Sequence, residues 1–381
     1  MKNLLRLGTT VAFLASCATL LNLPVSAADP GQPSWGGGQH LVFAQTNGAG
    51  GNQVIVYRHT AEGPILVGRY LTGGVGATAS AAVVDSLASQ GSLVFDPGHQ
   101  VLISVNAGSD SISVFQVGGG GIALRQVLSS AGSFPDSIAV SGQLVYVLNG
   151  GGVGVLQGYH FDGDRLRPIP GSARSLGLTN TDPPNYLESP GQVGFTPNGR
   201  QLVVTTKASG SDIDVFTVAA NGQLGAPTVN PSAQPVPFGF TFDNFGHLVV
   251  TEAGSSSVTT YNLSPGGGLI AIATLGDGQA ALCWITRVDG FYYGANAGSN
   301  SLSGYTVGFN GSLALLGPDG GVLANTDAGP IDMAVGSDGV LYAEAGGAGA
   351  IDEFQINRNG SLTAIGSVTG LGAGIEGIAV S

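Results

Sequence analysis

The sequence predicts an all-β protein: a seven-bladed β-propeller with four-stranded antiparallel blades, in which the C-terminal strand completes the N-terminal blade. Three observations predict it. A motif recurs along the chain, from "VNAGSDSISVFQV" at residues 105–117 to "ANAGSNSLSGYTV" at 295–307. Asn-Gly and Asp-Gly pairs, which favour two-residue hairpin turns because both positions need positive φ, separate short apolar segments. The first repeat lacks a strand one, and the chain ends on a strand-one sequence.

The N-terminal residues 1–27 are a predicted secretory signal peptide. Basic residues precede an apolar stretch over 7–23, and "VSA" supplies small residues before the cleavage point. Two alternatives stay open: a permanent membrane anchor, and a lipoprotein signal in which Cys17 is lipidated. We expect a secreted or periplasmic protein with a Gly-rich segment at 28–39 and a single propeller domain at 40–381.

The composition is that of a folded, acidic protein. Charged residues make up 9% of the chain and hydrophobic residues 43%, which is ample for a core. Signal cleavage would lower the formal net charge from −12 to −14, so the surface would repel nucleic acid and anionic membranes. Cys283 would be the one remaining cysteine, which excludes an intrachain disulfide. We expect it to be a buried structural thiol, because no His occupies a neighbouring position.

The repeats follow one another in order along the chain. The first, over residues 40–71, supplies strands two, three and four. Six full repeats follow between residues 91 and 371, with 43 to 58 residues between equivalent positions, a period typical of propellers. The tail "IEGIAVS" at 375–381 matches strand one of the other repeats, as in "DSIAV" at 136–140. It therefore closes the ring and removes the open sheet edges, whereas a β-sandwich or a solenoid would leave the split repeat unexplained.

Propeller ligands are expected over the mouth of the central channel, at the starts of strand one and the ends of strand two, although architecture alone does not fix function. Lys207 is the one lysine of the mature chain and lies at a predicted strand-two end, and Glu252 occupies that position in the next blade. Facing one dry channel, the two could shift each other's pKa and act as an acid/base pair. The alternative is a structural ion pair between neighbouring blades. Aligning the repeats on "NAGS" gives these strand-two ends: Asn106, Asn149, Lys207, Glu252, Asn296 and Glu344.

Further polar residues mark the same mouth as a substrate-binding surface: Asp136, Gln192, Asp332, Glu344 and Glu376. The carboxylates could instead hold Ca²⁺ or cap backbone N–H groups at strand ends. Because the sequence has no EF-hand loop and no His-rich spacing, we expect no metal site and no cofactor.

A long connection, "TNTDPPNYLESPGQ" at 179–192, is predicted to open on the same face as the mouth. It could be a lid or a wall of a binding cleft, in which Tyr186 would contact a ligand. It could equally be a tolerated surface insertion.

Three stretches carry a family resemblance: "SLVFDPGHQVLISVNAGSDSISVFQV", "QVGFTPNGRQLVVTTKASGSDIDVF" and "IDMAVGSDGVLYAEAGGAGAIDEF". They resemble the lactonase-type seven-bladed propellers, the family of 6-phosphogluconolactonase and carboxymuconate-lactonizing enzyme, and are most similar to its secreted bacterial branch. The resemblance implies lactone chemistry, with Pro-Arg-His or Pro-His-His at strand-one starts and a Glu after one strand-two Asn. The matching strand-one starts here are Pro135-Asp136-Ser137, Pro190-Gly191-Gln192, Pro237-Phe238-Gly239 and Pro330-Ile331-Asp332. The catalytic residues of the family therefore have no counterparts in this sequence.

Two functions stay open. One is a secreted lactonase-like hydrolase that acts on a neutral or weakly charged lactone or ester, with Lys207 and Glu252 as its catalytic pair. The other is a non-catalytic extracellular ligand-binding or scaffold propeller. In both cases we expect a monomer that binds a small-molecule or carbohydrate-like ligand, with no nucleic-acid partner and no membrane anchor after signal cleavage.

Overall fold

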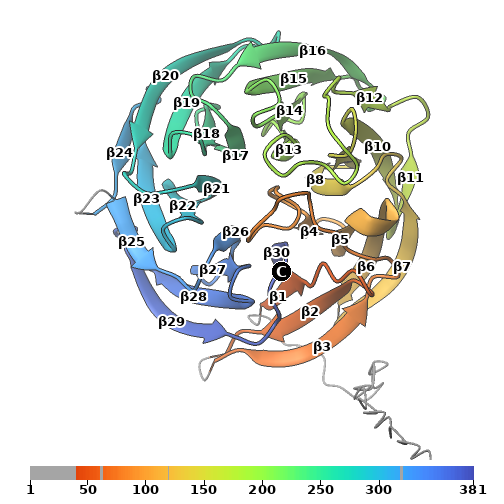
Figure 1. Cartoon of the computed structure of the whole chain (residues 1–381), viewed down its shortest axis with the longest axis horizontal. Helices are drawn as coiled ribbons and strands as arrows, with labels where there is room; N and C mark the ends of the chain where they lie inside the picture. The colour runs from red at the N-terminus through yellow and green to blue at the C-terminus, as the bar shows by residue number, and fades with distance from the viewer. Residues whose placement is uncertain (1–39, 61–62, 119, 318–320) are drawn as a thin grey trace, which may run out of the picture.

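The computed structural model describes residues 40–60, 63–118, 120–317 and 321–381, which form seven antiparallel β-sheets around a central axis (Figure 1). The predicted seven-bladed propeller is thus confirmed. The predicted signal peptide at 1–27, with Cys17, and the Gly-rich segment at 28–39 lie outside the described residues. Within the part of the chain that the structure describes, no helix is long and apolar enough to cross a membrane.

Blades 1 to 4 contain strands β1 to β16 and the C-terminal strand β30. Blade 1 is built from β1 (Leu41–Gln45), β2 (Gln53–Arg58), β3 (Ile65–Leu71) and β30 (Ile378–Val380). Blade 2 is built from β4 (Leu93–Asp96), β5 (Val101–Asn106), the short 3₁₀ turn η1 (Ala107–Ser109), β6 (Ser111–Gly118) and β7 (Gly121–Ser129). Blade 3 is built from β8 (Pro135–Ser141), β9 (Leu144–Asn149), β10 (Val155–Asp162), β11 (Arg165–Pro168) and β12 (Arg174–Ser175). Blade 4 is built from β13 (Gln192–Phe195), β14 (Gln201–Thr205), β15 (Asp212–Val218) and β16 (Leu224–Pro231).

Blades 5 to 7 follow the same pattern. Blade 5 is built from β17 (Pro237–Phe242), β18 (Leu248–Glu252), β19 (Ser257–Leu263) and β20 (Leu269–Gly276). Blade 6 is built from β21 (Leu282–Val288), β22 (Phe291–Asn296), β23 (Ser301–Val307), β24 (Leu313–Leu315) and β25 (Val322–Asn325). Blade 7 is built from β26 (Pro330–Val335), β27 (Val340–Ala345), β28 (Ala350–Ile356) and β29 (Leu362–Val368). Blades 3 and 6 have five strands because their outer strand is split into two pieces, β11 with β12 and β24 with β25, which pair with the same neighbour.

Of two hairpin turns predicted to be type I′, one has the expected conformation and the other does not. Asp289 and Gly290 both have positive φ, 48° and 86°, as a type I′ turn requires. At Asn198-Gly199 the positive φ of 67° belongs to Gly199, and its N–H donates to Thr196 O at 2.8 Å. That turn is therefore a longer loop that ends on a left-handed glycine.

The C-terminal strand closes the ring as predicted. β30 pairs antiparallel with β1, with Ala44 opposite Ile378 and Val42 opposite Val380. Backbone hydrogen bonds continue on both sides of the short strand, from Glu376 N to Gln45 O (2.9 Å) and from Ser381 N to Leu41 O (3.0 Å). The innermost strand of blade 1 thus comes from the other end of the chain.

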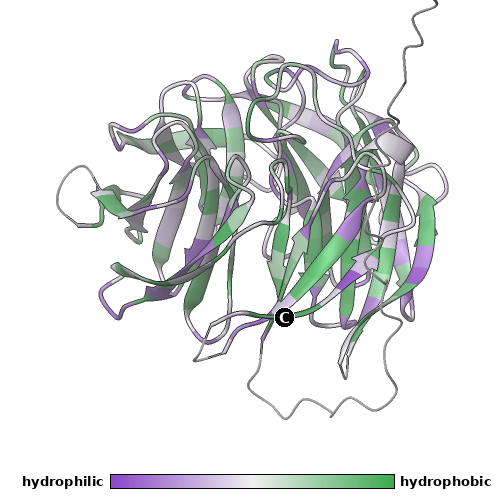
Figure 2. Cartoon of the chain, turned by 60° about the horizontal axis from the view of Figure 1, so that its bottom comes forward, coloured by the Kyte–Doolittle hydropathy of each residue, from purple (hydrophilic) through white to green (hydrophobic). Residues whose placement is uncertain are grey.

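The hydrophobic core lies between neighbouring blades rather than at the centre of the ring. One cluster joins blades 1 and 7 through Val42, Ile55, Tyr342 and Ile378, among others. Figure 2 shows hydrophobic residues concentrated along the packed strands and hydrophilic residues at the turns on the rim. Because each blade buries both faces against its neighbours, the fold leaves the strand ends and their loops to form any site.

Candidate functional site

Four of the predicted strand-two ends point into their own blade. Asn106, Asn149, Glu252 and Asn296 are the last residues of their strands and lie opposite a residue of strand three. The side-chain amides of Asn106 and Asn296 donate to the serine hydroxyls five and seven residues later, at 2.8–3.3 Å. Strand three lies on the side of strand two away from the channel, so these side chains support the blade rather than line the mouth.

Glu252 has the same structural role as these asparagines. Its carboxylate is fully buried and accepts five hydrogen bonds, from Ser232 Oγ, Gln234 N, Ser257 Oγ, Thr259 Oγ1 and Tyr261 OH, at 2.5–3.2 Å. Ser257 and Thr259 are again the residues five and seven positions later. Among the described residues no ion pair within 4.0 Å joins Glu252 to Lys207. The predicted pairing of the two side chains is therefore not formed.

Lys207 and Glu344 are each displaced by one residue from the predicted strand-two end. Thr206 N donates to Asp212 O at 3.0 Å, so Thr206 takes the place of the asparagines and Lys207 is an extra residue, with φ of 50°. In blade 7 the last paired residue is Ala345, which places Glu344 on the opposite face of its strand. Because side chains alternate between faces, one step in register redirects both residues toward the mouth.

The mouth is filled by the chain itself. The connection from β3 to β4 runs across the centre of the ring, and we call its last part, residues 84–91, the hub segment (Figure 1). Leu87, Ala88 and Ser89 of this segment are almost completely buried. The hub segment forms hydrogen bonds with blades 1, 3, 4, 6 and 7, so it ties most of the ring together from within.

Gln90 shows how the hub segment bonds to the ring. Its side-chain amide donates to Ile285 O at 2.9 Å and accepts from Ile285 N at 3.1 Å, which completes the inner edge of β21. Its backbone N–H donates to Gly191 O at 2.9 Å, on the way into blade 4. A Cβ at Gly239 of blade 5 would lie 2.3 Å from Gln90 Oε1, so only glycine fits there.

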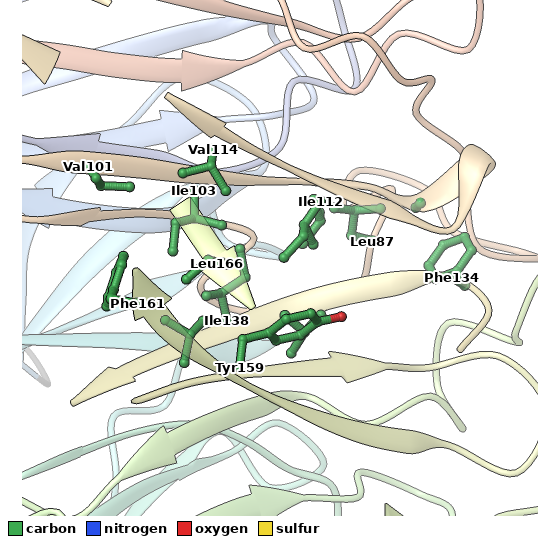
Figure 3. Close-up of a cluster of buried hydrophobic side chains, with 14 of the residues drawn as sticks. Leu87, Val101, Ile103, Ile112, Val114, Phe134, Ile138, Tyr159, Phe161 and Leu166 are labelled. Carbon is green, nitrogen blue, oxygen red and sulfur yellow. The ribbon is translucent and has the colours of Figure 1, made fainter. Parts of the chain in front are cut away.

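An apolar anchor holds the hub segment as well. Leu87 belongs to the core cluster between blades 2 and 3, together with Ile112, Phe134 and Ile138 (Figure 3). On the other side of the segment, Trp284 Nε1 donates to Ser89 O at 3.0 Å. Burial of one such leucine stabilises by roughly 1.5–3 kcal/mol, so the hub segment is a packed part of the fold.

The predicted long loop at 179–192 lies against the hub connection. Ser80 and Asn185 form a parallel bridge, and Tyr186 N donates to Ser80 O at 3.1 Å. The Tyr186 side chain is 38% exposed, and its backbone oxygen accepts a hydrogen bond from Lys207 Nζ. The loop thus lies on the face of the mouth, as predicted, and there it contacts the protein's own chain.

Lys207 joins these two connections to each other. Lys207 is 1% exposed, and its Nζ donates to Ala88 O (2.5 Å), to Tyr186 O and to Ser189 Oγ (2.9 Å). The ring of Phe238 lies 5.0 Å from Nζ, in a cation–π arrangement. All three ammonium donors are therefore used within the fold, and none is left for a ligand.

Bulges in strand one aim further side chains at the mouth. The register shifts at Asp136 in β8, at Cys283 in β21 and at Asp332 in β26. A bulge places two residues opposite one and turns the extra side chain out of the ladder. Asp332 Oδ2 consequently accepts the N–H of Gly91 at 3.3 Å, and burial raises the pKa of the Cys283 thiol, as expected for a structural cysteine.

Five carboxyl groups meet around the hub segment, and burial raises the pKa of each: Asp85, Asp136, Asp332, Glu344 and Glu376. For Asp332 the pKa reaches about 7. Asp85, on the hub segment itself, is hydrogen-bonded to the Glu376 side chain, an arrangement that needs a proton on one of the two. Burial therefore favours the protonated form of each of these groups.

Several of these oxygens have no partner. Both carboxylate oxygens of Asp136 are buried without a hydrogen bond among the described residues, as are Glu344 Oε1 and Glu376 Oε1. Burial lowers the pKa of Lys207 to about 8, while Asp85, Asp136, Cys283 and Glu376 oppose the shift. The mouth thus combines one lysine with an excess of carboxyl groups in a space closed to solvent.

The remaining predictions concern Gln192 and the metal. Gln192 Oε1 accepts the N–H of Phe240 at 2.6 Å, so it bridges blades 4 and 5. Over the described ranges, no group of three His, Cys, Asp or Glu side chains is arranged to hold a metal ion.

The sequence analysis did not predict Asp85 or the hub segment. The feature that could have indicated them is the 21-residue gap from β3 to β4, which carries the apolar stretch "AAVVDSLASQ".

The model of the family "Lactonase, 7-bladed beta-propeller" matches residues 92–283, which is half of the chain. Solved structures of similar fold include a proposed 6-phosphogluconolactonase of Bacteroides fragilis, with a TM-score of 0.67, 16% identity, and coverage of 92% of this chain and 99% of that one. Another is the periplasmic gluconolactonase of Pseudomonas aeruginosa, with a TM-score of 0.69, 15% identity, and coverage of 90% and 99%.

At sequence identities of this size, the similarity to solved structures shows the fold alone. No curated protein matches the chain. The family match extends from β4 to the bulge of β21, and so includes complete blades as well as part of the mouth. Together with the seven closed blades, it shows that the chain belongs to the seven-bladed β-propeller lactonase family.

Proposed function

We propose that this protein is an extracellular ligand-binding or scaffold propeller that carries out no lactone chemistry at its channel mouth. The observation that supports this is the hub segment, which occupies the place where a substrate of a lactonase-type propeller would be expected. The three N–H donors of the Lys207 ammonium group bind acceptors within the protein, and the Glu252 carboxylate is buried within blade 5. The predicted acid/base pair of Lys207 and Glu252 is therefore not formed.

The test is a direct assay for turnover. We expect the purified protein to release no acid from a panel of sugar lactones and neutral lactones in a pH-stat, at any protein concentration. Lys207→Met and Glu252→Gln serve as matched variants, since both side chains are buried and neither substitution changes the surface. Hydrolysis that is lost in either variant would contradict the proposal. Thermal-shift and calorimetric titration with neutral oligosaccharides then test binding directly.

A second function, hydrolysis of a neutral or weakly charged lactone or ester, is favoured by one observation. Ionisable groups with shifted pKa values gather at functional sites, and the mouth holds five such carboxyl groups and Lys207. In this case the hub segment would have to leave before a substrate could enter. Turnover that rises when the hub segment is weakened would support this alternative over a binding propeller.

We further propose a secreted or periplasmic location, a monomer, and a small-molecule or carbohydrate-like ligand. The signal-like sequence at 1–27 supports the location, and the Pseudomonas aeruginosa neighbour is itself described as periplasmic. The acidic composition supports a partner other than nucleic acid. Cell fractionation with an antibody to the protein, and light scattering of the purified chain, test these two points.

A further inference from the structure

Carboxyl groups are among the groups that hold the hub segment at the mouth. Glu376 Oε2 accepts Leu87 N at 3.3 Å, the Glu376 side chain is hydrogen-bonded to the Asp85 side chain, and Asp85 Oδ1 accepts Ala88 N at 2.5 Å. Asp332 Oδ2 accepts Gly91 N at 3.3 Å. Carboxyl groups from two other parts of the chain thus reach one buried segment, and Asp85 within the segment bonds to its own backbone.

The other ionisable groups that face the hub segment add to the same charge. Glu344 on β27 and Asp136 on β8 supply two more buried carboxyl groups, and Cys283 on β21 supplies a thiol. Among the described residues that face the segment, the cation is Lys207, which follows β14. The aromatic side chains Phe238 and Trp284 complete the surroundings and carry no charge.

The closed arrangement therefore depends on proton occupancy. With protons on the carboxyl groups, the Asp85–Glu376 bond forms and the mouth holds little net charge. When the carboxyl groups ionise, as many as five negative charges face a single lysine, and that lysine has a pKa of about 8. Buried like charges repel strongly, and an isolated buried carboxylate is unfavourable by itself. Ala88, held in the left-handed region at φ 56°, adds backbone strain that is released if the segment leaves.

We propose that the hub segment is a proton-dependent latch on the channel mouth: it stays docked while the surrounding carboxyl groups hold protons and detaches when they ionise. Detachment opens the mouth and exposes Trp284, Phe238 and the carboxyl groups to solvent. The ring itself stays closed, because the pairing of β30 with β1 and the core cluster between blades 1 and 7 do not involve the segment. Detachment gives up the packing of Leu87 in the cluster between blades 2 and 3. The inference goes beyond the proposed function, since it holds for a binding propeller and for a hydrolase alike.

The experiment follows Trp284, which donates its indole N–H to the hub segment. The full chain has two tryptophans, so a Trp35→Phe background leaves Trp284 as the single fluorophore. Acrylamide quenching is measured between about pH 5 and about pH 9, a range that brackets the Asp332 pKa of about 7. We expect the quenching constant to rise several-fold toward alkaline pH while the far-UV circular dichroism of the ring stays constant.

Matched variants separate the latch from a general loosening of the protein. Asp85→Asn keeps the shape and the Ala88 contact but removes the charge, so we expect quenching to stay low at all pH values. Asp214→Asn is the control: Asp214 is a buried carboxyl of β15 with a pKa raised to about 6, and we expect quenching to rise as in the parent. Glu376→Gln repeats the test if Asp85→Asn does not fold.

Two results would overturn the latch. One is a quenching constant that stays flat until the circular dichroism signal is lost. The other is a rise in Asp85→Asn and Glu376→Gln equal to that in the parent. Neither result bears on lactone turnover, so a failed latch and a failed functional proposal remain distinguishable.

Discussion

Removal of residues 375–381 should unfold blade 1 and with it the ring. The deletion takes away β30, which is the inner strand of that blade, and exposes the edge of β1. It also removes the Glu376 carboxyl from the hub segment. We expect a protein that melts far below the full chain or aggregates during purification.

The magnitude follows from the contacts that disappear. Ile375 and Ile378 are 1% and 4% exposed in the cluster between blades 1 and 7, and burying each stabilises by roughly 1.5–3 kcal/mol. Val380 is only partly buried and adds less. Several backbone hydrogen bonds to residues 41–45 are lost as well, each worth about 0.5–1.5 kcal/mol net. The sum is on the order of 5–10 kcal/mol, which matches the whole stability of a typical domain.

Thermal melts by circular dichroism check this, with a deletion of residues 29–35 as the length-matched control, since that stretch matches no repeat strand. A milder variant, Ile378→Ala, should lower the free energy of unfolding by about 2–5 kcal/mol, which keeps the test usable if the deletion cannot be purified. Full stability of the C-terminal deletion would show that the closing strand does not hold the ring together.

Three further predictions concern buried polar groups. Lys207→Met should lower the free energy of unfolding by several kcal/mol, because two backbone carbonyls lose their hydrogen-bond donor and each loss costs about 1–3 kcal/mol. An unchanged midpoint of urea unfolding would refute the bridging role of Lys207. Glu252→Gln should be nearly neutral in the same assay, since amides fill this position at Asn106 and Asn296, whereas Glu252→Leu should be costly. The free energy of unfolding should fall as pH rises from about 4 to about 7. Asp332 and Asp214 have folded-state pKa values of about 7 and about 6, above the ordinary value, so the folded protein binds more protons than the unfolded chain in this window. Urea titrations in which the free energy of unfolding rises over this range would contradict these shifts.

The fold could be predicted from the sequence because its repeats carry local signals. The hairpin glycines and the alternation of short apolar strands set each blade, and the unmatched strand one at 375–381 indicated the closure. The turn at Asp289 followed the expected type, whereas Asn198-Gly199 did not, since a two-residue signal cannot separate a tight turn from a longer loop.

The mouth could be predicted only in part. Asp136, Asp332 and Glu376 do meet there, as their positions at strand-one starts indicated, whereas Glu344 reaches the mouth because it is one step out of the predicted register. The direction of Lys207 depends on one inserted residue, and a motif alignment does not resolve a step of that size. The hub segment escaped prediction for a different reason: its apolar stretch at 81–90 matches none of the repeat strands.

Ring closure also places a demand on the newly made chain. The hydrogen bond between His40 Nδ1 and Ser381 O joins residues 341 positions apart, whereas the contacts inside the other blades are local hairpins. Blades 2 to 7 can therefore form in order as the chain is synthesised. The edge of β1 stays unpaired until β30 has been synthesised. During that interval the free edge of one molecule can accept the C-terminal strand of another, so exchange of this strand is the expected route to misassembly at high concentration.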